Sequence, residues 1–184
     1  MQTYICLLRG VNVSGKNLIK MDALKQLFLN LGCVNIATYI QSGNVIFTSK
    51  DKDVLKLKSE IYDKINEEFG LNIPILIIPK KELESAITNN IFQKNRSEDI
   101  TKLHVTVMSQ QPQATDIAQI MAVNYGEDEF IIIDKCIYLF CPNGYGNTKL
   151  TNTFFEKKLN VSCTTRNWKT VNELLKLANN IVKI

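Results

Sequence analysis

The sequence predicts an α+β protein built from two ferredoxin-like (split βαβ) halves, duplicated and packed together, with C-terminal helices. Two observations support this prediction. In residues 1–79, strand-like and helix-like segments follow one another in the order β-α-β-β-α-β, and only Ser42-Gly43-Asn44 separates the two middle strands. A polar turn this short implies a hairpin and therefore antiparallel pairing. Residues 80–184 repeat the beginning of this order with a modified end, so we expect the two domains to divide after Pro79.

The first half begins with a short apolar strand that ends at Arg9-Gly10. Its two helices are indicated by apolar residues spaced three and four apart, and each is followed by a glycine that can end it. Its other strands are apolar runs bounded by turn residues or by proline. In chain order we expect a strand at 3–8, a helix at 21–31, strands at 36–41 and 45–49, a helix at 54–69 and a strand at 73–78.

The second half, residues 80–184, repeats these signals and adds a C-terminal helical extension. Its hairpin is expected to turn at Asp134-Lys135. In chain order we expect a helix at 80–89, a strand at 103–108, a helix at 114–123, strands at 130–133 and 136–141, and helices at 149–159 and 168–182.

Several of the expected strands are apolar on both faces, including those at 3–8, 73–78 and 130–133. A single two-layer sheet would leave one face wet and alternating. We therefore expect both sheet faces to be covered, either by the other half or by a partner chain.

The composition is typical of a globular chain, with 184 residues of which 45% are hydrophobic and 22% charged. No apolar run approaches the roughly 20 residues that cross a bilayer, and the start lacks a signal-type segment. The five cysteines include no C-x-x-C pair, so we expect them to be small buried apolar residues. We expect a cytoplasmic protein with no membrane contact, no metal and no cofactor. The net charge of +4 permits weak attraction to anions but indicates no long nucleic-acid footprint.

The loop after the first strand, Gly10-Val11-Asn12-Val13-Ser14-Gly15-Lys16-Asn17, nearly fits the phosphate-loop pattern G-x-x-x-x-G-K-[ST]. In that motif glycines let backbone amides surround the phosphates, the lysine reaches the terminal phosphates, and the final hydroxyl ligates magnesium. Asn17 cannot supply this hydroxyl, and the hairpin that follows disagrees with the parallel sheet of phosphate-loop enzymes. We therefore expect a site for an anion or polar ligand. A phosphoryl-transfer enzyme with an atypical phosphate loop and a plain loop of turn glycines and solvated cations are the alternatives.

Topology groups this loop with the hairpin turn, because the first and third strands of a split βαβ sheet are adjacent and antiparallel. A further polar block, Thr164–Trp168, precedes the last helix, where it can cap the helix and favour anions. The candidate ligand-binding residues are Arg9, Gly10, Asn12, Gly15, Lys16, Asn17, Gln41, Ser42, Asn44, Arg166 and Asn167. Ordinary turn and capping chemistry is the alternative for these asparagines and serines.

Two further features carry less information about function. The Gly/Asn-rich segment Pro142–Lys149 could cradle a ligand through its amides or simply turn the chain. His104 is the only histidine, and neither G-x-S-x-G nor H-E-x-x-H occurs, so no catalytic group is identified.

Three blocks of the sequence resemble a family of small bacterial proteins, the domain of unknown function 1697. The blocks are Leu7–Val13 with Gly15-Lys16-Asn17 and Lys20-Met21, then Thr38–Phe47, and finally Thr164–Val171. Ser14 stands where a second glycine is more usual. The resemblance implies a cytoplasmic α+β protein with two ferredoxin-like halves and no established activity, so no catalytic residue can be carried over. It also implies that the three polar blocks belong together.

These observations predict a protein that binds a small anionic or nucleotide-like ligand, or nucleic-acid phosphate, through Gly/Asn-rich loops. Whether it is an enzyme is left open. The remaining alternative is a purely structural or interaction protein, including a homo-oligomer whose partner chain covers the two-faced strands.

Overall fold

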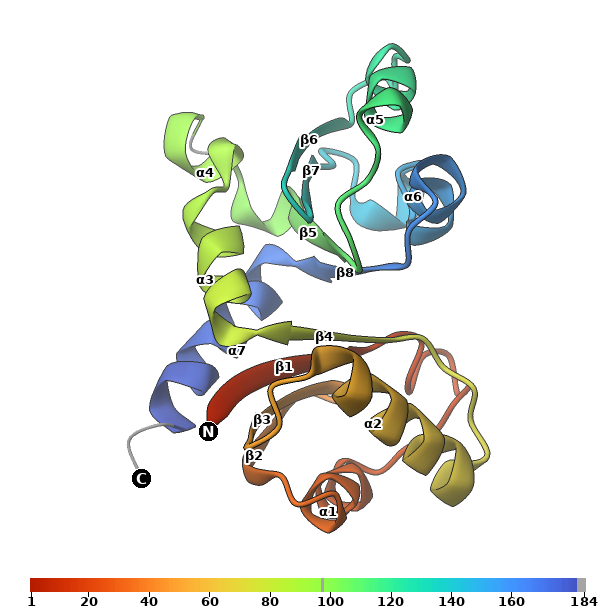
Figure 1. Ribbon diagram of the computed structural model, residues 1–184. Coiled ribbons are helices and arrows are strands. Elements are labelled where there is room, and N and C mark those ends of the chain that lie inside the picture. Colours follow the sequence, from red (N-terminus) through yellow and green to blue (C-terminus); the bar gives the residue numbers. More distant parts are fainter. Residues whose placement is uncertain (97, 182–184) are drawn as a thin grey trace. The chain divides into compact units, whose positions relative to one another are not determined.

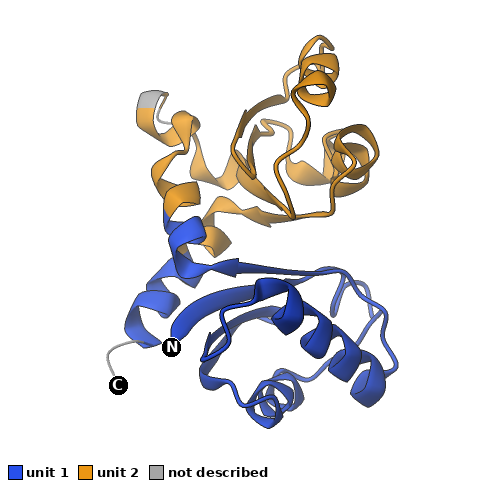
Figure 2. Cartoon of the chain, in the orientation of Figure 1, with its two compact units in different colours: residues 1–84, 173–184 blue, residues 85–172 orange. Residues whose placement is uncertain are grey.

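The computed structural model describes residues 1–96 and 98–181 and contains two four-stranded antiparallel sheets with their helices (Figure 1). The chain divides into two compact units, residues 1–84 with 173–184 and residues 85–172 (Figure 2). The boundary between them thus lies at Glu84, beyond the predicted division after Pro79. The C-terminal segment groups with the first unit, although the sequence assigned it to the second half. Val182, the predicted end of the last helix, lies outside the described residues.

The first unit has the predicted β-α-β-β-α-β order. Its sheet has the strand order β2-β3-β1-β4, and central β1 is antiparallel to both of its neighbours. This is the split βαβ arrangement. Its elements are β1 (Gln2–Leu8), α1 (Met21–Asn30), β2 (Val34–Tyr39), β3 (Asn44–Ser49), α2 (Val54–Phe69) and β4 (Ile75–Pro79).

Local sequence explains where α2 begins and ends. The Asp53 side chain accepts hydrogen bonds from the amides of Leu55 and Lys56, which satisfies two of the unpaired donors of the first turn. Gly70 ends the helix in the left-handed conformation with φ of 65°. Leu57, Ile61 and Ile65 share its buried face and join the core on the helix-covered side of the sheet.

The second unit repeats the arrangement, with strand order β6-β7-β5-β8. The duplicated ferredoxin-like halves predicted from the sequence are therefore confirmed. The elements from residue 80 onward are α3 (Lys80–Thr88), α4 (Ile91–Asn95), the 3₁₀ turn η1 (Ile100–Lys102), β5 (Leu103–Met108), α5 (Ala114–Met121), β6 (Glu129–Ile133), β7 (Cys136–Phe140), the 3₁₀ turn η2 (Tyr145–Asn147), α6 (Asn152–Leu159), β8 (Cys163–Asn167) and α7 (Trp168–Ile181).

Strand β8 is absent from the sequence-based prediction, which treated residues 164–168 as a polar block before a helix. This strand lacks the apolar pattern that predicts strands from sequence, because polar contacts hold it at the edge of the sheet. The Thr165 Oγ1 atom lies 2.6 Å from that of Thr106 and donates to Asn152 Oδ1 at 2.8 Å. With β8 in place, α6 is the second helix of a complete ferredoxin-like half rather than part of an extension.

Burial of the strands agrees with the two-faced pattern in most cases. Every residue of β3 and β5 is buried, as are Thr3–Leu8 of β1. Strand β6 differs, because only Phe130 is buried and Ile131–Ile133 are half-buried at the edge of their sheet.

A charged cluster around Arg96 joins the end of α4 to strand β6. Its guanidinium donates to both carboxylate oxygens of Glu129, at 2.6 and 2.8 Å, and its Nε donates to Glu98 at 2.7 Å. The same group lies over the rings of Phe92 and Phe140, at 5.2 and 5.6 Å from their centroids. The Arg96 hydrogen bonds lower the pKa of Glu129 below its ordinary value.

This lowered pKa makes the stability of the second unit depend on pH. The contribution is present above the unfolded pKa of the carboxyl and is lost as the pH falls through the lowered pKa of the folded state. We expect Arg96→Gln to flatten the acid side of a plot of unfolding temperature against pH, between about pH 5 and pH 2. The effect is small because the pair is exposed. Lys94→Gln is the control, and an acid limb unchanged by Arg96→Gln would contradict the assignment.

Candidate functional site

The loop after β1 forms a miniature hairpin. The amide of Asn12 donates to the Asn17 carbonyl at 3.1 Å, and the amide of Lys16 donates to the Val13 carbonyl at 2.9 Å. Between them, Ser14 and Gly15 have φ values of 50° and 75°. Positive φ at both central residues is the signature of a type I′ turn, which joins two antiparallel strands.

This geometry differs from that of a phosphate loop. There the lysine and the hydroxyl residue open a helix whose amides face the phosphates. Here α1 begins only at Met21, and Asn17 is a left-handed residue with φ of 49°. The Asn17 Nδ2 atom donates to the Gly10 carbonyl at 2.9 Å and closes the base of the hairpin. The near-match in sequence therefore reflects hairpin chemistry.

The Asn12 side chain joins this hairpin to two other segments. Its Nδ2 atom donates to the carbonyls of Ile19 and Gln41, at 2.9 and 2.8 Å, and its Oδ1 atom accepts from the Ile19 amide at 2.9 Å. The amide of Leu8 donates to the Gly43 carbonyl at 2.8 Å. The loop after β1 and the turn before β3 thus lie side by side, as the predicted topology required.

The turn before β3 is equally fixed. Asn44 is fully buried, and its Nδ2 atom donates to Ser42 Oγ at 2.8 Å and to the Tyr39 carbonyl at 3.3 Å. Gly43 has φ of 69°, and a Cβ atom there would lie 2.8 Å from the Leu8 Cβ. The side-chain amides of Asn12, Asn17 and Asn44, all proposed from sequence as ligand-binding groups, are therefore engaged by the protein itself. The Asn17 and Asn44 amides bond within their own loops, and the Asn12 amide joins the two loops.

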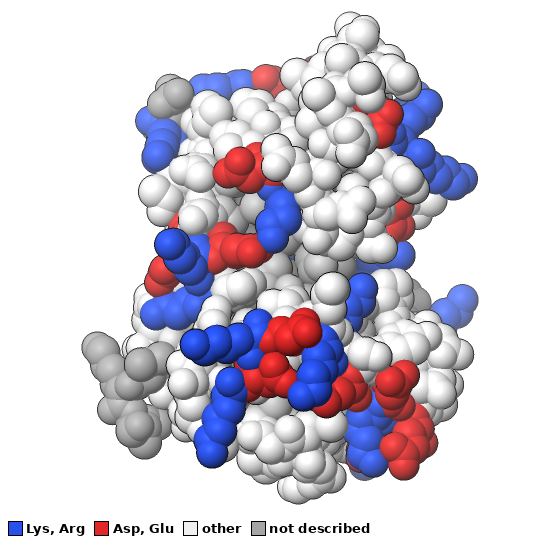
Figure 3. Space-filling view, in the orientation of Figure 1, with Lys and Arg blue, Asp and Glu red and all other residues white. Residues whose placement is uncertain are grey.

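The side chains left at the surface of this loop pair are basic, amide-bearing, hydroxyl-bearing or aliphatic. Lys16, Lys20 and Gln41 are exposed and Arg9 is half-buried. Residues 1–21 and 34–50 contain no aspartate or glutamate. By contrast, over α2 basic and acidic side chains alternate and pair, as Lys56 does with Asp51 at 2.7 Å (Figure 3). Lys16 and Lys20 are therefore exposed cations in segments that contain no acidic residue.

Three aliphatic side chains at this surface were not anticipated from the sequence. Val13, Leu18 and Ile40 are 55%, 70% and 55% exposed. Val13 follows Asn12, and the other two precede the residues to which the Asn12 side chain bonds. Ile40 also has φ of 49°, a conformation that is costly for a β-branched residue. In the sequence, isolated aliphatic residues inside polar loops could have indicated this surface. The positive φ of Ile40, however, cannot be inferred from the sequence.

Arg166 and Asn167 belong to the second unit and lie on β8. The Asn167 Oδ1 atom accepts from the Thr170 amide at 2.8 Å, which confirms the predicted capping of the last helix. Arg166 Nη1 donates to the Thr165 carbonyl at 2.9 Å. Their membership in one ligand site with the first-unit loops stays a prediction.

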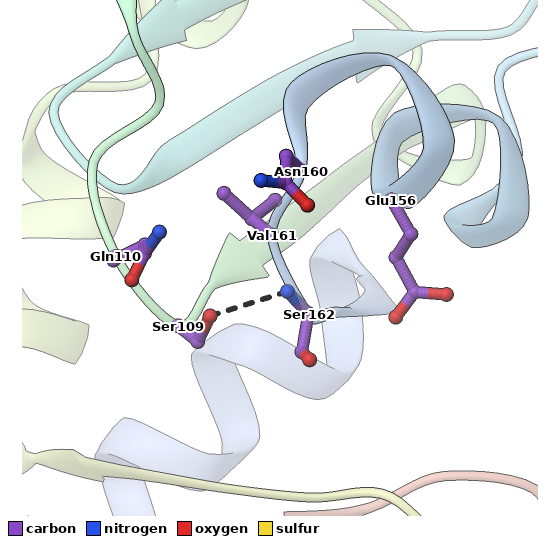
Figure 4. Close-up of a pocket in the computed structure, with 6 residues that line it drawn as sticks. All are labelled: Ser109, Gln110, Glu156, Asn160, Val161 and Ser162. Carbon is purple, nitrogen blue, oxygen red and sulfur yellow. Dashed lines mark hydrogen bonds between the residues drawn. The ribbon is translucent and has the colours of Figure 1, made fainter.

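The second unit allows an internal comparison at the end of its own central strand, β5. The Ser109 amide donates to the Ser162 carbonyl at 2.8 Å, just as the Arg9 amide donates to the Pro74 carbonyl at 3.0 Å. A cavity of about 290 Å³ lies here (Figure 4). Its lining residues are Ser109, Gln110, Glu156, Asn160, Val161 and Ser162. Glu156 is the only charged member of this lining, so the second unit has no basic residue lining the cavity at this position.

The fold and the loops define a duplicated ferredoxin-like α+β protein. The profile of the family described as "Protein of unknown function (DUF1697)" matches residues 1–138, and the chain belongs to this family. The third resembling block, Thr164–Val171, lies beyond the matched residues.

A solved structure of a conserved bacterial protein from Streptococcus pneumoniae is similar to this chain. It is 23% identical, with a TM-score of 0.75 over 96% of this chain and 98% of that one, and supports the fold. No curated protein matches. Among residues 1–96 and 98–181, no helix combines the length and the apolar character needed to cross a membrane.

The close approach at Gly43 makes a direct prediction about stability. We expect Gly15→Ala to cost about 1–2 kcal/mol, since it adds a left-handed alanine in open space. Gly43→Ala adds overpacking against Leu8 and is expected to cost a further 1–3 kcal/mol or so. Urea unfolding of both variants measures the difference. Equal losses would contradict the proposed packing of Gly43 on Leu8.

The strain at Ile40 makes a second prediction, of opposite sign. Ile40→Asn should raise the free energy of unfolding by about 1 kcal/mol, because asparagine tolerates positive φ and little apolar surface is lost. Ile40→Val keeps the branched Cβ and should bring no gain. If Ile40→Asn is no more stable than Ile40→Val in chemical denaturation, the residue is not strained.

Proposed function

We propose that the first unit binds a small phosphate-bearing anion, such as a nucleotide or a nucleic-acid phosphate, at the surface of the loop after β1. Arg9 and Lys16 supply the positive charge, and Gln41 supplies a neutral donor. The observation that carries the proposal is a tightly bonded loop pair bearing cations in segments without a single acidic residue.

Rigidity supports binding at this surface. A loop already fixed by side-chain amides loses little conformational freedom when a ligand arrives, so more of the contact energy appears as affinity. The arginine fork and the lysine charge are the groups that proteins use for phosphate. The strained backbone at Ile40 further supports a role for this turn, because such conformations cluster at binding sites.

The candidate ligand-binding residues divide into two roles under this proposal. Arg9, Lys16 and Gln41 contact the ligand, together with the exposed backbone at Gly10 and Gly15. Asn12, Asn17, Ser42 and Asn44 position them through the hydrogen bonds described above. The proposal assigns binding rather than catalysis, and it places the protein in the cytoplasm. It does not require Arg166 or Asn167.

The proposal is tested by thermal-shift and calorimetric titration with inorganic phosphate, ATP and a short oligonucleotide. We expect at least one of them to stabilise the protein, and Lys16→Ala or Arg9→Ala to weaken its binding about tenfold, the loss expected for one charge-assisted hydrogen bond.

Lys52→Ala, which removes an exposed lysine outside the loop, is the matched control and should bind normally. Absence of binding by all three probes, or equal binding by the Lys16 and Lys52 variants, would overturn the proposal.

A further inference from the structure

The Gly/Asn-rich segment of the second unit, which the proposed function leaves unused, borders a cavity of about 380 Å³. This volume lies within the range of small-molecule sites. The opposite wall comes from the segment that links α5 to β6. The lining residues are Val123, Asn124, Tyr125, Gly126, Asp128, Asn147 and Lys149.

Hydrogen bonds hold both walls in place. The buried Thr148 hydroxyl donates to Asp128 Oδ2 at 2.5 Å and accepts from the Leu150 amide at 3.0 Å. The Asn147 side chain donates to the Asn143 carbonyl at 2.8 Å. The cavity is therefore preformed, so a ligand can bind without the cost of ordering its walls.

Asp128 and Lys149 place opposite charges on this lining. In the described part of the chain the two form no ion pair with each other, although both border the same space. Only one oxygen of the half-buried Asp128 is bonded to Thr148. A ligand with a single charge would match one of these groups and leave the other unmatched.

The rest of the lining adds apolar surface. Val123 borders the cavity. The Tyr125 hydroxyl donates a hydrogen bond to the Ile120 carbonyl at 3.0 Å. The Tyr125 ring packs edge-on against Phe130 and Phe154. A fixed aromatic ring and a valine offer contact to a short aliphatic chain.

We propose that this cavity binds a small zwitterion, in which a primary ammonium and a carboxylate are joined by a short aliphatic chain. Asp128 binds the ammonium, Lys149 binds the carboxylate, and Val123 and Tyr125 contact the methylene groups. This site lies within the second unit and is independent of the anion site proposed for the first.

The test uses ω-amino acids of increasing length: glycine, β-alanine, 4-aminobutyrate and 6-aminohexanoate. Butylamine and butyrate carry one charge each and serve as matched controls. We expect at least one ω-amino acid to raise the unfolding temperature by about 2–4 °C at saturation, and the single-charge controls to leave it unchanged. No shift with any ω-amino acid, or an equal shift with butylamine or butyrate, would overturn the proposal.

Three variants assign the effect to the cavity. Asp128→Asn keeps an oxygen for the Thr148 hydroxyl but removes the charge, and Lys149→Gln removes the opposite charge from an exposed position. Each should weaken binding at least tenfold in calorimetry. Lys158→Gln removes an exposed lysine of the same unit outside the cavity and should bind like the wild type. Wild-type affinity in Asp128→Asn and Lys149→Gln would place the ligand elsewhere and overturn the assignment.

Discussion

The structure of the loops at one end of the first unit's sheet depends on the side-chain amide of Asn12. It bonds to both backbone polar groups of Ile19 and to the carbonyl of Gln41, so a single residue ties the miniature hairpin, the approach to α1 and the turn before β3 into one body. Backbone N–H and carbonyl groups must form hydrogen bonds when they are removed from water, and a side-chain amide offers both a donor and an acceptor. The positions of Lys16, Gln41 and the exposed aliphatic residues follow from this tie.

The same amide clarifies what the sequence could and could not predict. Apolar runs and helical spacing predicted β1 and α2, and the short polar turn and the topology predicted the hairpin of the first unit. They also predicted that the loop after β1 meets the turn before β3. They could not show that Asn12 holds the loop together whereas Lys16 lies at its surface, because that depends on which groups each side chain contacts in the fold. The sequence left both a phosphate loop and a plain turn open at Gly15-Lys16 for a related reason: a glycine after serine fits a type I′ turn equally well.

The missed strand β8 has a different cause. Its threonines hold the edge of the sheet through hydroxyl contacts rather than apolar burial, and such contacts leave no periodic pattern in a sequence. Once β8 is recognised, the two halves become topologically equivalent, and their differences become informative. At the end of the central strand the first half has a loop of 12 residues bearing three cations, from Arg9 to Lys20. The second half has there a short, largely neutral loop beside a cavity with one carboxylate. Duplication preserved the scaffold while the chemistry at this position diverged.

The division of the chain also has a consequence for synthesis. The first unit is discontinuous, since it combines residues 1–84 with the C-terminal segment from Glu173, whereas the second unit is one uninterrupted stretch. A ribosome makes the chain from its N-terminus, so every residue of the second unit is available before the first unit receives its last segment. Nascent chains can therefore complete the later half while the earlier half still lacks the residues from Glu173 onward. Termination anywhere after residue 84 and before Glu173 therefore leaves the N-terminal unit incomplete, even though its entire sheet has been made.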